Sequence, residues 1–175
     1  MKKVFFLTLL AIFVMNDYSY GQALVPREGP NGKWGFVDEA AGRLLIPFKY
    51  DAADGFAEGL ASVCYGGKWG FIDRNDSAII PFMYEWVDHF TGGLAKATLN
   101  GKTGFIDQTG ETVIPFKYDF AVGFTLGNVF SEKGFSMVSV DGKYGFIDRA
   151  GMEIVPIKHT TEEAVQAIQE FINTQ

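Results

Sequence analysis

The sequence contains few of the residues on which metal and redox chemistry depend. Its 175 residues include one cysteine, Cys64, and two histidines, His89 and His159, which lie 70 positions apart. One thiol cannot form an internal disulfide, and the histidines lack the short spacing of a zinc site. Phosphate-binding loops, dinucleotide fingerprints, Gly-x-Ser-x-Gly elbows and Cys-x-x-Cys pairs are also missing. We therefore expect no catalytic residue, no metal site and no cofactor.

Positive charge is scarce as well. The chain has 15 Lys and Arg against 21 Asp and Glu, which gives a net charge of −6 at pH 7, and its basic residues form no stripe. An acidic protein repels the phosphate backbone of nucleic acids and the headgroups of anionic lipids. Nucleic acids are therefore not expected among its partners.

Long hydrophobic runs are missing too. The longest apolar run, residues 4–15, has twelve residues, whereas a helix that spans a bilayer needs about 20. The run follows two lysines and precedes the small residues Ser19 and Gly21, which is the layout of a secretory signal peptide. We predict a signal peptide at residues 1–21, with an uncleaved anchor or a buried helix as the alternative. The mature chain is then exported to the periplasm, cell surface or medium, with no transmembrane span.

Glycine and aromatic residues are abundant, with 21 Gly, 17 Phe, 7 Tyr and 3 Trp, and much of this surplus belongs to an internal repeat. One block reads GKWGFVD, GKWGFID, GKTGFID and GKYGFID at residues 32–38, 67–73, 101–107 and 142–148. A second block reads LIPFKY, IIPFMY, VIPFKY and IVPIKH at residues 45–50, 79–84, 113–118 and 154–159. A third block, F-x-x-G-L-A, occurs at residues 56–61 and 90–95. A period of about 34 residues indicates a repeat architecture.

These blocks resemble the bacterial WG-repeat family, also called KWG repeats, over residues 32–159. The resemblance implies a bacterial all-β repeat protein, usually without an assigned activity. Thr103 and Tyr144 replace the signature Trp, and His159 replaces the Tyr of the second block. A residue that half of the copies can lose is difficult to assign to catalysis.

The alternation of a strand places the aromatic residues of the first block on one face, which we expect to form the core. These repeat-core residues are Trp34, Phe36, Trp69, Phe71, Phe105, Tyr144 and Phe146. The block's final aspartate is expected to cap a turn, and the next strand is expected to end at the proline of the second block. Each unit then forms a three-stranded antiparallel meander that crosses the repeat boundary.

Such a meander cannot bury its apolar face alone, so neighbouring units must stack. We predict an all-β domain over residues 22–159, made of tandem antiparallel β-meander repeats stacked as an open array. The units cover about 32–66, 67–100, 101–141 and 142–159. Residues 160–175 have the pattern of an amphipathic helix with a Thr160–Glu163 capping box, which would cover the last unit. The alternative is a closed propeller-like ring in which residues 23–25 complete the fourth unit.

Some residues fall outside the repeat pattern or differ from their counterparts. Cys64 occupies a slot that is polar in other copies, and strand alternation predicts that it points outward as an accessible free thiol. Residues 120–130 form an apolar insertion that either packs onto the sheet, which we favour, or presents a hydrophobic tip. The candidate partner-binding residues are Phe120, Phe124, Leu126 and Phe130 from this insertion, together with Trp86.

Three functions are compatible with this pattern. The first is an exported, non-catalytic binding or scaffold protein whose stacked strands contact a protein or an envelope polymer. The second is a glycan-binding module that uses exposed aromatic rings, with Trp86 as the best candidate. The third is an enzyme, which requires a cleft that gathers His89 or His159 with carboxylates from different units.

Overall fold

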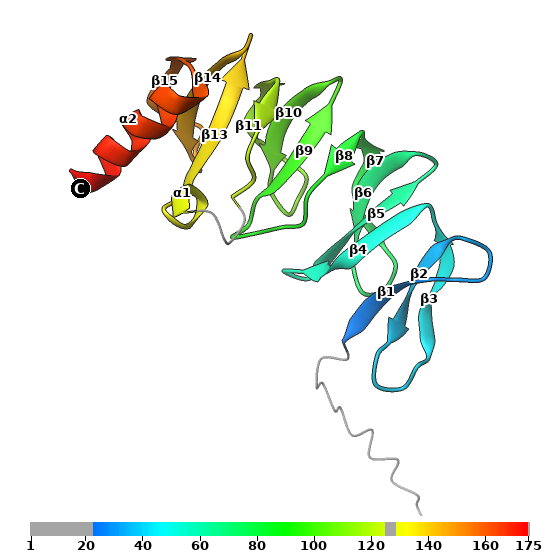
Figure 1. Cartoon of the computed structure of the whole chain (residues 1–175). Helices are drawn as coiled ribbons and strands as arrows, with labels where there is room; N and C mark the ends of the chain where they lie inside the picture. The colour runs from blue at the N-terminus through cyan, green and yellow to red at the C-terminus, as the bar shows by residue number, and fades with distance from the viewer. Residues whose placement is uncertain (1–22, 125–128, 175) are drawn as a thin grey trace, which may run out of the picture.

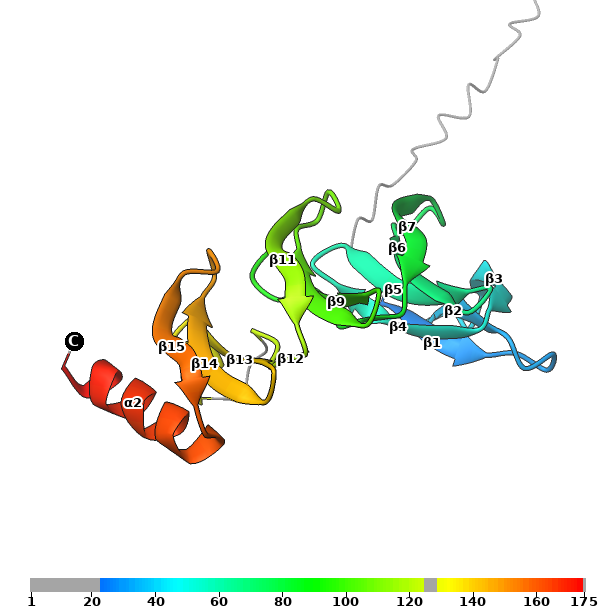
Figure 2. The same ribbon diagram turned by 90° about the horizontal axis from the view of Figure 1, so that it is seen from above.

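Four antiparallel β-sheets are stacked one after another along a curved array (Figures 1 and 2). This computed structural model describes residues 23–124 and 129–174, so the predicted signal peptide and Leu126 lie outside the described residues. The sheets are open at their edges, and the array does not close into a ring. The predicted all-β open array is therefore confirmed.

The sheets follow the order of the chain. The first contains β1 (Leu24–Glu28), β2 (Trp34–Asp38) and β3 (Leu44–Tyr50). The second contains β4 (Ala52–Ala57), β5 (Leu60–Tyr65), β6 (Lys68–Ile72) and β7 (Ala78–Tyr84). The third contains β8 (Trp86–Val87), β9 (Ala95–Leu99), β10 (Lys102–Ile106) and β11 (Thr112–Tyr118). The fourth contains β12 (Phe120–Ala121), β13 (Phe135–Val140), β14 (Lys143–Asp148) and β15 (Glu153–His159), with α1 (Val129–Glu132) between β12 and β13. The expected three-stranded meander is thus present in each sheet, and three sheets add a fourth strand, β4, β8 or β12, at one edge.

The two ends of the array are completed differently. At one end β1 pairs with β2, with Val25 opposite Val37, so the alternative in which residues 23–25 close a ring with the fourth unit is wrong. At the other end α2 (Thr161–Asn173) packs on β14 and β15 (Figure 1). Its Thr160–Glu163 capping box is present as predicted. Ala164 and Ile168 of α2 are fully buried, so the helix covers the last sheet.

The strand of the second block does not end at its proline, which corrects the sequence-based expectation. In β7 the chain continues through Pro81 to Tyr84 by way of a β-bulge: Ile80 is opposite Phe71 and Tyr84 is opposite Trp69, which leaves two extra residues in β7. The same irregularity occurs in β3, β11 and β15. All four are edge strands, where a missing N–H group interrupts no ladder on the outer side.

The bulge explains the glycine of the repeat motif. A Cβ atom on Gly70 would lie 2.6 Å from the carbonyl oxygen of Ile80, and one on Gly104 would lie 2.6 Å from that of Ile114. Corresponding carbonyls crowd Gly35 and Gly145. Because the obstacle is backbone, only glycine fits beneath the bulge.

The hydrophobic core lies between successive sheets. The motif phenylalanines Phe36, Phe71, Phe105 and Phe146 are buried. Each packs against another aromatic ring, in the pairs Phe36–Phe56, Phe71–Phe90, Phe105–Phe124 and Phe146–Phe130, with ring centroids 4.7–5.1 Å apart. In the first three pairs the partner follows in the chain, whereas Phe130 precedes Phe146. Among the other predicted core residues, Trp69 is buried while Trp34 and Tyr144 are half-buried.

The turns follow the predicted chemistry. The carboxylates of Asp38, Asp73, Asp107 and Asp148 each accept bonds from backbone N–H groups of the turn that follows. The hairpin residues Gly66, Gly67, Asn100, Gly101, Asp141 and Gly142 all have positive φ, as expected for tight Asn-Gly and Asp-Gly hairpins.

Candidate functional site

A groove of about 520 Å³ separates corresponding edges of the second and third sheets. One wall is the segment 54–57, which belongs to β4, and the other is the segment 86–89, which begins with β8. The residues that line it are Asp54, Gly55, Phe56, Ala57, Trp86, Val87, Asp88 and His89. Its volume lies within the range of small-molecule sites, about 300–1,000 Å³.

Trp86 presents a fixed aromatic surface to this groove. Its side chain is 49% exposed. Its indole Nε1 donates a hydrogen bond to Asp88 Oδ1 at 3.1 Å, and its ring meets the buried Trp69 at a centroid distance of 5.0 Å and an angle of 60°. The hydrogen bond and the ring contact together hold the indole in one orientation.

The polar groups of the groove come from both walls. Asp88 forms an ion pair with Lys96 at 3.1 Å in addition to accepting the Trp86 bond. On the opposite wall Asp54 Oδ2 accepts a hydrogen bond from Ser62 at 3.0 Å. His89 is exposed. The groove therefore combines one aromatic platform with carboxylate and imidazole groups, and the Asp88 charge is neutralised locally.

Gly55 leaves an opening in the wall opposite Trp86. It occupies the position in the second sheet that His89 has in the third, since both residues follow an Asp and precede a core Phe. A Cβ atom on Gly55 would meet nothing within 4 Å, and its backbone does not have a positive φ. Since Gly55 lines the groove, a side chain introduced there should occupy groove space without straining the backbone.

The predicted partner-binding residues have different surroundings. Phe120 is 46% exposed in β12 and corresponds to Trp86, because Trp86 is opposite Thr98 and Phe120 is opposite Ser139. Phe124 is buried, with the Arg149 guanidinium 4.8 Å from its ring centroid. Phe130 is half-buried. Packing of the insertion is thus confirmed for Phe124, which presents no surface to a partner.

The sequence reasoning missed Asp54 and Asp88 as neighbours of Trp86. A signal was present, because Trp86 and Phe120 each lie two residues after the Tyr of the second block and share one slot. The sequence pattern did not reveal that Trp86 lines a groove together with β4, the edge strand of the preceding sheet.

Cys64 is buried, at 7% exposure, so its prediction as an outward, accessible thiol is wrong. Val63 packs toward the first sheet and Cys64 toward the third, next to Trp69. Alternation of side chains along a strand gives an exposed face only when one side of the sheet meets solvent. Here both sides of the second sheet are covered, one by the first sheet and the other by the third. Tyr65, the last residue of the same strand, is exposed.

We expect Cys64 to react with Ellman's reagent at least about tenfold more slowly in the native protein than in urea, because burial hides the thiol and raises its pKa. The measurement is the rate of thiol release at pH 8 with and without denaturant. Equal rates would contradict the burial of Cys64.

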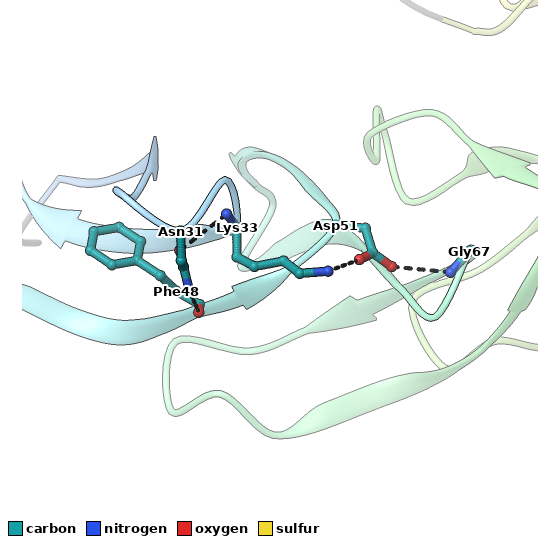
Figure 3. A network of polar contacts seen from close by, with 5 residues as sticks. All are labelled: Asn31, Lys33, Phe48, Asp51 and Gly67. Atoms are coloured by element: carbon teal, nitrogen blue, oxygen red, sulfur yellow. Dashed lines mark hydrogen bonds and ion pairs between the residues drawn. The ribbon is translucent and has the colours of Figure 1, made fainter.

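A second group of polar side chains ties neighbouring sheets together (Figure 3). Lys33 Nζ pairs with Asp51 Oδ1 at 2.5 Å, and Asp51 Oδ2 accepts a bond from the N–H of Gly67. The hydrogen bond between the two side chains raises the pKa of Lys33 and lowers that of Asp51. Lys102, Asp119 and Asp141 repeat the arrangement between the third and fourth sheets. This recurrence indicates a structural role.

Glu58 links the second sheet to the third. Its carboxylate accepts bonds from the N–H groups of Gly92 and Gly93 and from Gln108, while Arg149 donates to the carbonyl oxygens of Thr91 and Gly92. Burial alone would raise the pKa of Glu58, but the bonds from Gly93, Gly92 and Gln108 and the Arg149 charge outweigh it and lower the pKa below its usual value.

Because the folded pKa is lowered, the contribution of Glu58 to stability is present above its ordinary pKa of 4.5 and is lost as the pH falls through the folded value. We expect Glu58→Gln to lower the free energy of unfolding by about 1 kcal/mol at pH 7, and the difference from the unmodified protein to shrink toward pH 3. Urea unfolding at both pH values measures this. Glu39→Gln, in an exposed turn, is the control and should change nothing; a Glu58→Gln deficit that stays constant with pH would contradict the assignment.

Two equivalent tyrosines differ in their partners. Tyr50 donates a hydrogen bond to Asp76 at 2.5 Å, in the turn of the next sheet. For Tyr118, the turn of the next sheet has Gly151 at the position that Asp76 occupies for Tyr50. The buried Tyr118 hydroxyl therefore has no hydrogen-bond partner among the described residues.

We expect Tyr118→Phe to raise the free energy of unfolding by about 1 kcal/mol, because it removes a buried hydroxyl that forms no bond. Tyr50→Phe is the matched control and should lower it by about 1 kcal/mol, since it removes the bond to Asp76. Thermal and urea unfolding of both variants provide the test. Equal losses in the two variants would show that the Tyr118 hydroxyl has a partner.

Metal sites and membrane-spanning helices find no support within the residues that the structure describes. Within residues 23–124 and 129–174, no group of three or more His, Cys, Asp or Glu side chains is arranged to hold a metal ion. None of the helices there has the length and apolar character that crossing a membrane requires. His89 lies in the groove, whereas His159 lies at the capped end beside Glu163, at 3.9 Å.

Comparison with known proteins returned one family. The model of the family described as "WG containing repeat" matches three times, at residues 34–69, 69–102 and 104–144. Curated proteins and solved structures returned no match. The three matches cover more than half of the chain and coincide with the motif residues at which the sheets repeat.

Proposed function

Since the chain belongs to the WG-repeat family, we propose that it is an exported, non-catalytic binding or scaffold protein that holds an envelope polymer or a protein partner. The observation that supports this most directly is the groove between the second and third sheets, with its exposed and immobilised Trp86. Rigid scaffolds that present preformed concave sites to ligands are typical of repeat arrays.

The chemistry of the groove supports binding rather than catalysis. A general base needs a carboxylate or imidazole that is free to take a proton from a substrate. Asp88 is engaged by Lys96 and by the Trp86 indole. On the wall opposite Asp88, Asp54 accepts a hydrogen bond from Ser62 of the same sheet. The groove gathers His89 with Asp54 and Asp88, but in the described part of the chain no hydrogen bond or ion pair joins the imidazole to either carboxylate, which favours orienting a ligand over acid–base catalysis.

Export is supported by the first 21 residues, with their lysines, twelve-residue apolar run and small residues before Gln22. Expression of the full chain in a bacterial host, followed by fractionation and mass spectrometry of the N-terminus, tests this part. We expect a mature chain that begins at Gln22 outside the cytoplasm. An intact Met1 terminus would contradict it.

The binding role is tested with residues 22–175 immobilised on a biosensor and exposed separately to the polysaccharide and protein fractions of a cell envelope. We expect saturable binding from one fraction that free protein competes away and that Gly55→Trp weakens by filling the groove. Gly55→Ala is the control, since a methyl group there meets nothing and leaves the groove open. Absence of saturable binding from both fractions would overturn the proposal.

A further inference from the structure

We propose that the ligand of this groove is a neutral, linear oligosaccharide that stacks on Trp86 and extends along the array toward Phe120. The inference rests on the proposed binding role and specifies the class of ligand. It is carried by four features of the site: the aromatic platform, the polar groups around it, the charge balance and a second platform in the next sheet.

The platform suits a sugar ring. The faces of a pyranose carry C–H groups, which pack on the electron-rich face of an indole, and Trp offers the largest such surface. Trp86 is half exposed and is held by Asp88 and Trp69 before any ligand arrives. Since the ring is already ordered, binding loses little side-chain entropy.

The polar groups suit hydroxyls. A sugar hydroxyl both donates and accepts hydrogen bonds, and it therefore needs acceptors and donors side by side. Asp54 and Asp88 supply carboxylate acceptors from the two walls, and the two ring nitrogens of the exposed His89 add further hydrogen-bonding groups. These groups flank an aromatic surface within one groove, so a ring stacked on Trp86 has hydroxyl partners on both sides.

The charges favour a neutral ligand. Lys96 neutralises Asp88 at 3.1 Å, and the Arg74 guanidinium lies 5.3 Å from the ring centroid of Phe56, which lines the other wall. The charge of Asp88 is thus matched by Lys96, and a second cation, Arg74, lies beside Phe56 on the other wall. An anionic chain would meet a protein with a net charge of −6, and a cationic peptide would have to compete with Lys96 for Asp88.

A second platform favours a chain over a single sugar. Phe120 occupies the same slot as Trp86 in the next sheet and is 46% exposed. Stacked sheets lie about 10 Å apart, so the two rings repeat along the edge of the array that carries β8 and β12. A linear oligosaccharide can contact both rings, whereas a monosaccharide reaches only one.

The test is calorimetry of residues 22–175 with cellohexaose, xylohexaose, chitohexaose and mannohexaose, and with the corresponding trioses. We expect at least one hexaose to bind more tightly than its triose. Trp86→Ala should weaken both by about tenfold or more, and Phe120→Ala should weaken only the hexaose. Tyr65→Ala, which removes an equally exposed aromatic ring outside the groove, is the matched control and should leave binding unchanged.

A second variant guards against misfolding. Gly55→Trp fills the groove from the opposite wall while leaving Trp86 and Trp69 in contact, so it should abolish binding without changing the melting temperature. Failure of all four hexaoses, or hexaose binding that survives both Trp86→Ala and Gly55→Trp, would overturn the saccharide proposal. If an envelope protein binds in a Gly55-sensitive manner while no hexaose does, the binding role stands and the ligand class is wrong. If neither binds, both proposals fail.

Discussion

Gly104→Ala is expected to lower the free energy of unfolding by about 3 kcal/mol, enough to unfold a marginal domain at moderate temperature. The new methyl carbon would lie 2.6 Å from the Ile114 carbonyl oxygen and 2.9 Å from the Phe116 nitrogen. Both atoms belong to the backbone of β11, so relief requires the bulge and its pairing with β10 to shift. Urea unfolding followed by circular dichroism measures the loss.

Gly55→Ala is the matched control for this substitution. Gly55 also lies in a strand, but a Cβ atom there meets nothing within 4 Å. Alanine at such a position leaves the folded state unstrained and restricts the unfolded chain, so stability should stay level or rise by up to about 1 kcal/mol. If Gly104→Ala and Gly55→Ala behave alike, the motif glycine is not required by the bulge.

Deletion of residues 160–175 is expected to cost about 4 kcal/mol, because it uncovers two buried side chains of the last sheet, Phe146 and Val155. The shortened protein should bind the dye ANS, and its fourth sheet should lose amide protection first. Differential scanning fluorimetry, dye binding and hydrogen exchange measure these changes.

Ile168→Ala tests the same packing of α2 with a single substitution. Ile168 is fully buried in α2, and truncation should cost about 3 kcal/mol, whereas Gln169→Ala on the exposed face should have little effect. A deletion that leaves the melting temperature and the dye signal unchanged would show that α2 does not cap the array.

The local features of the fold could be predicted because each depends on a few consecutive residues. The Asn100–Gly101 hairpin turn, the Asp107 turn cap and the Thr160–Glu163 capping box are each determined within a few residues of the chain. The repeat itself follows from motif spacing. These features also imply that the units stack, since a three-stranded unit cannot bury its apolar face alone, but they left an open array and a closed ring as alternatives.

The errors all concern surfaces that two distant segments share. Alternation placed Cys64 outside, because the pattern of one strand does not contain the sheet that covers its second face. Pro81 was expected to end a strand, because the sequence does not reveal that this strand lies at an edge, where a bulge can absorb it.

The candidate site shows the same division. Sequence alone identified the repeat family, identified Trp86 as an aromatic residue free of the motif's core role, and favoured a capped, open array over a closed ring. Only the tertiary structure decided that Trp86 is held by Asp88 and Trp69 and lines one groove with the β4 edge of the preceding sheet. The physical reason is that turns and caps are governed by interactions between near neighbours in the chain, whereas a groove exists only where two sheets fail to touch. That gap depends on the packing of the large side chains between the sheets.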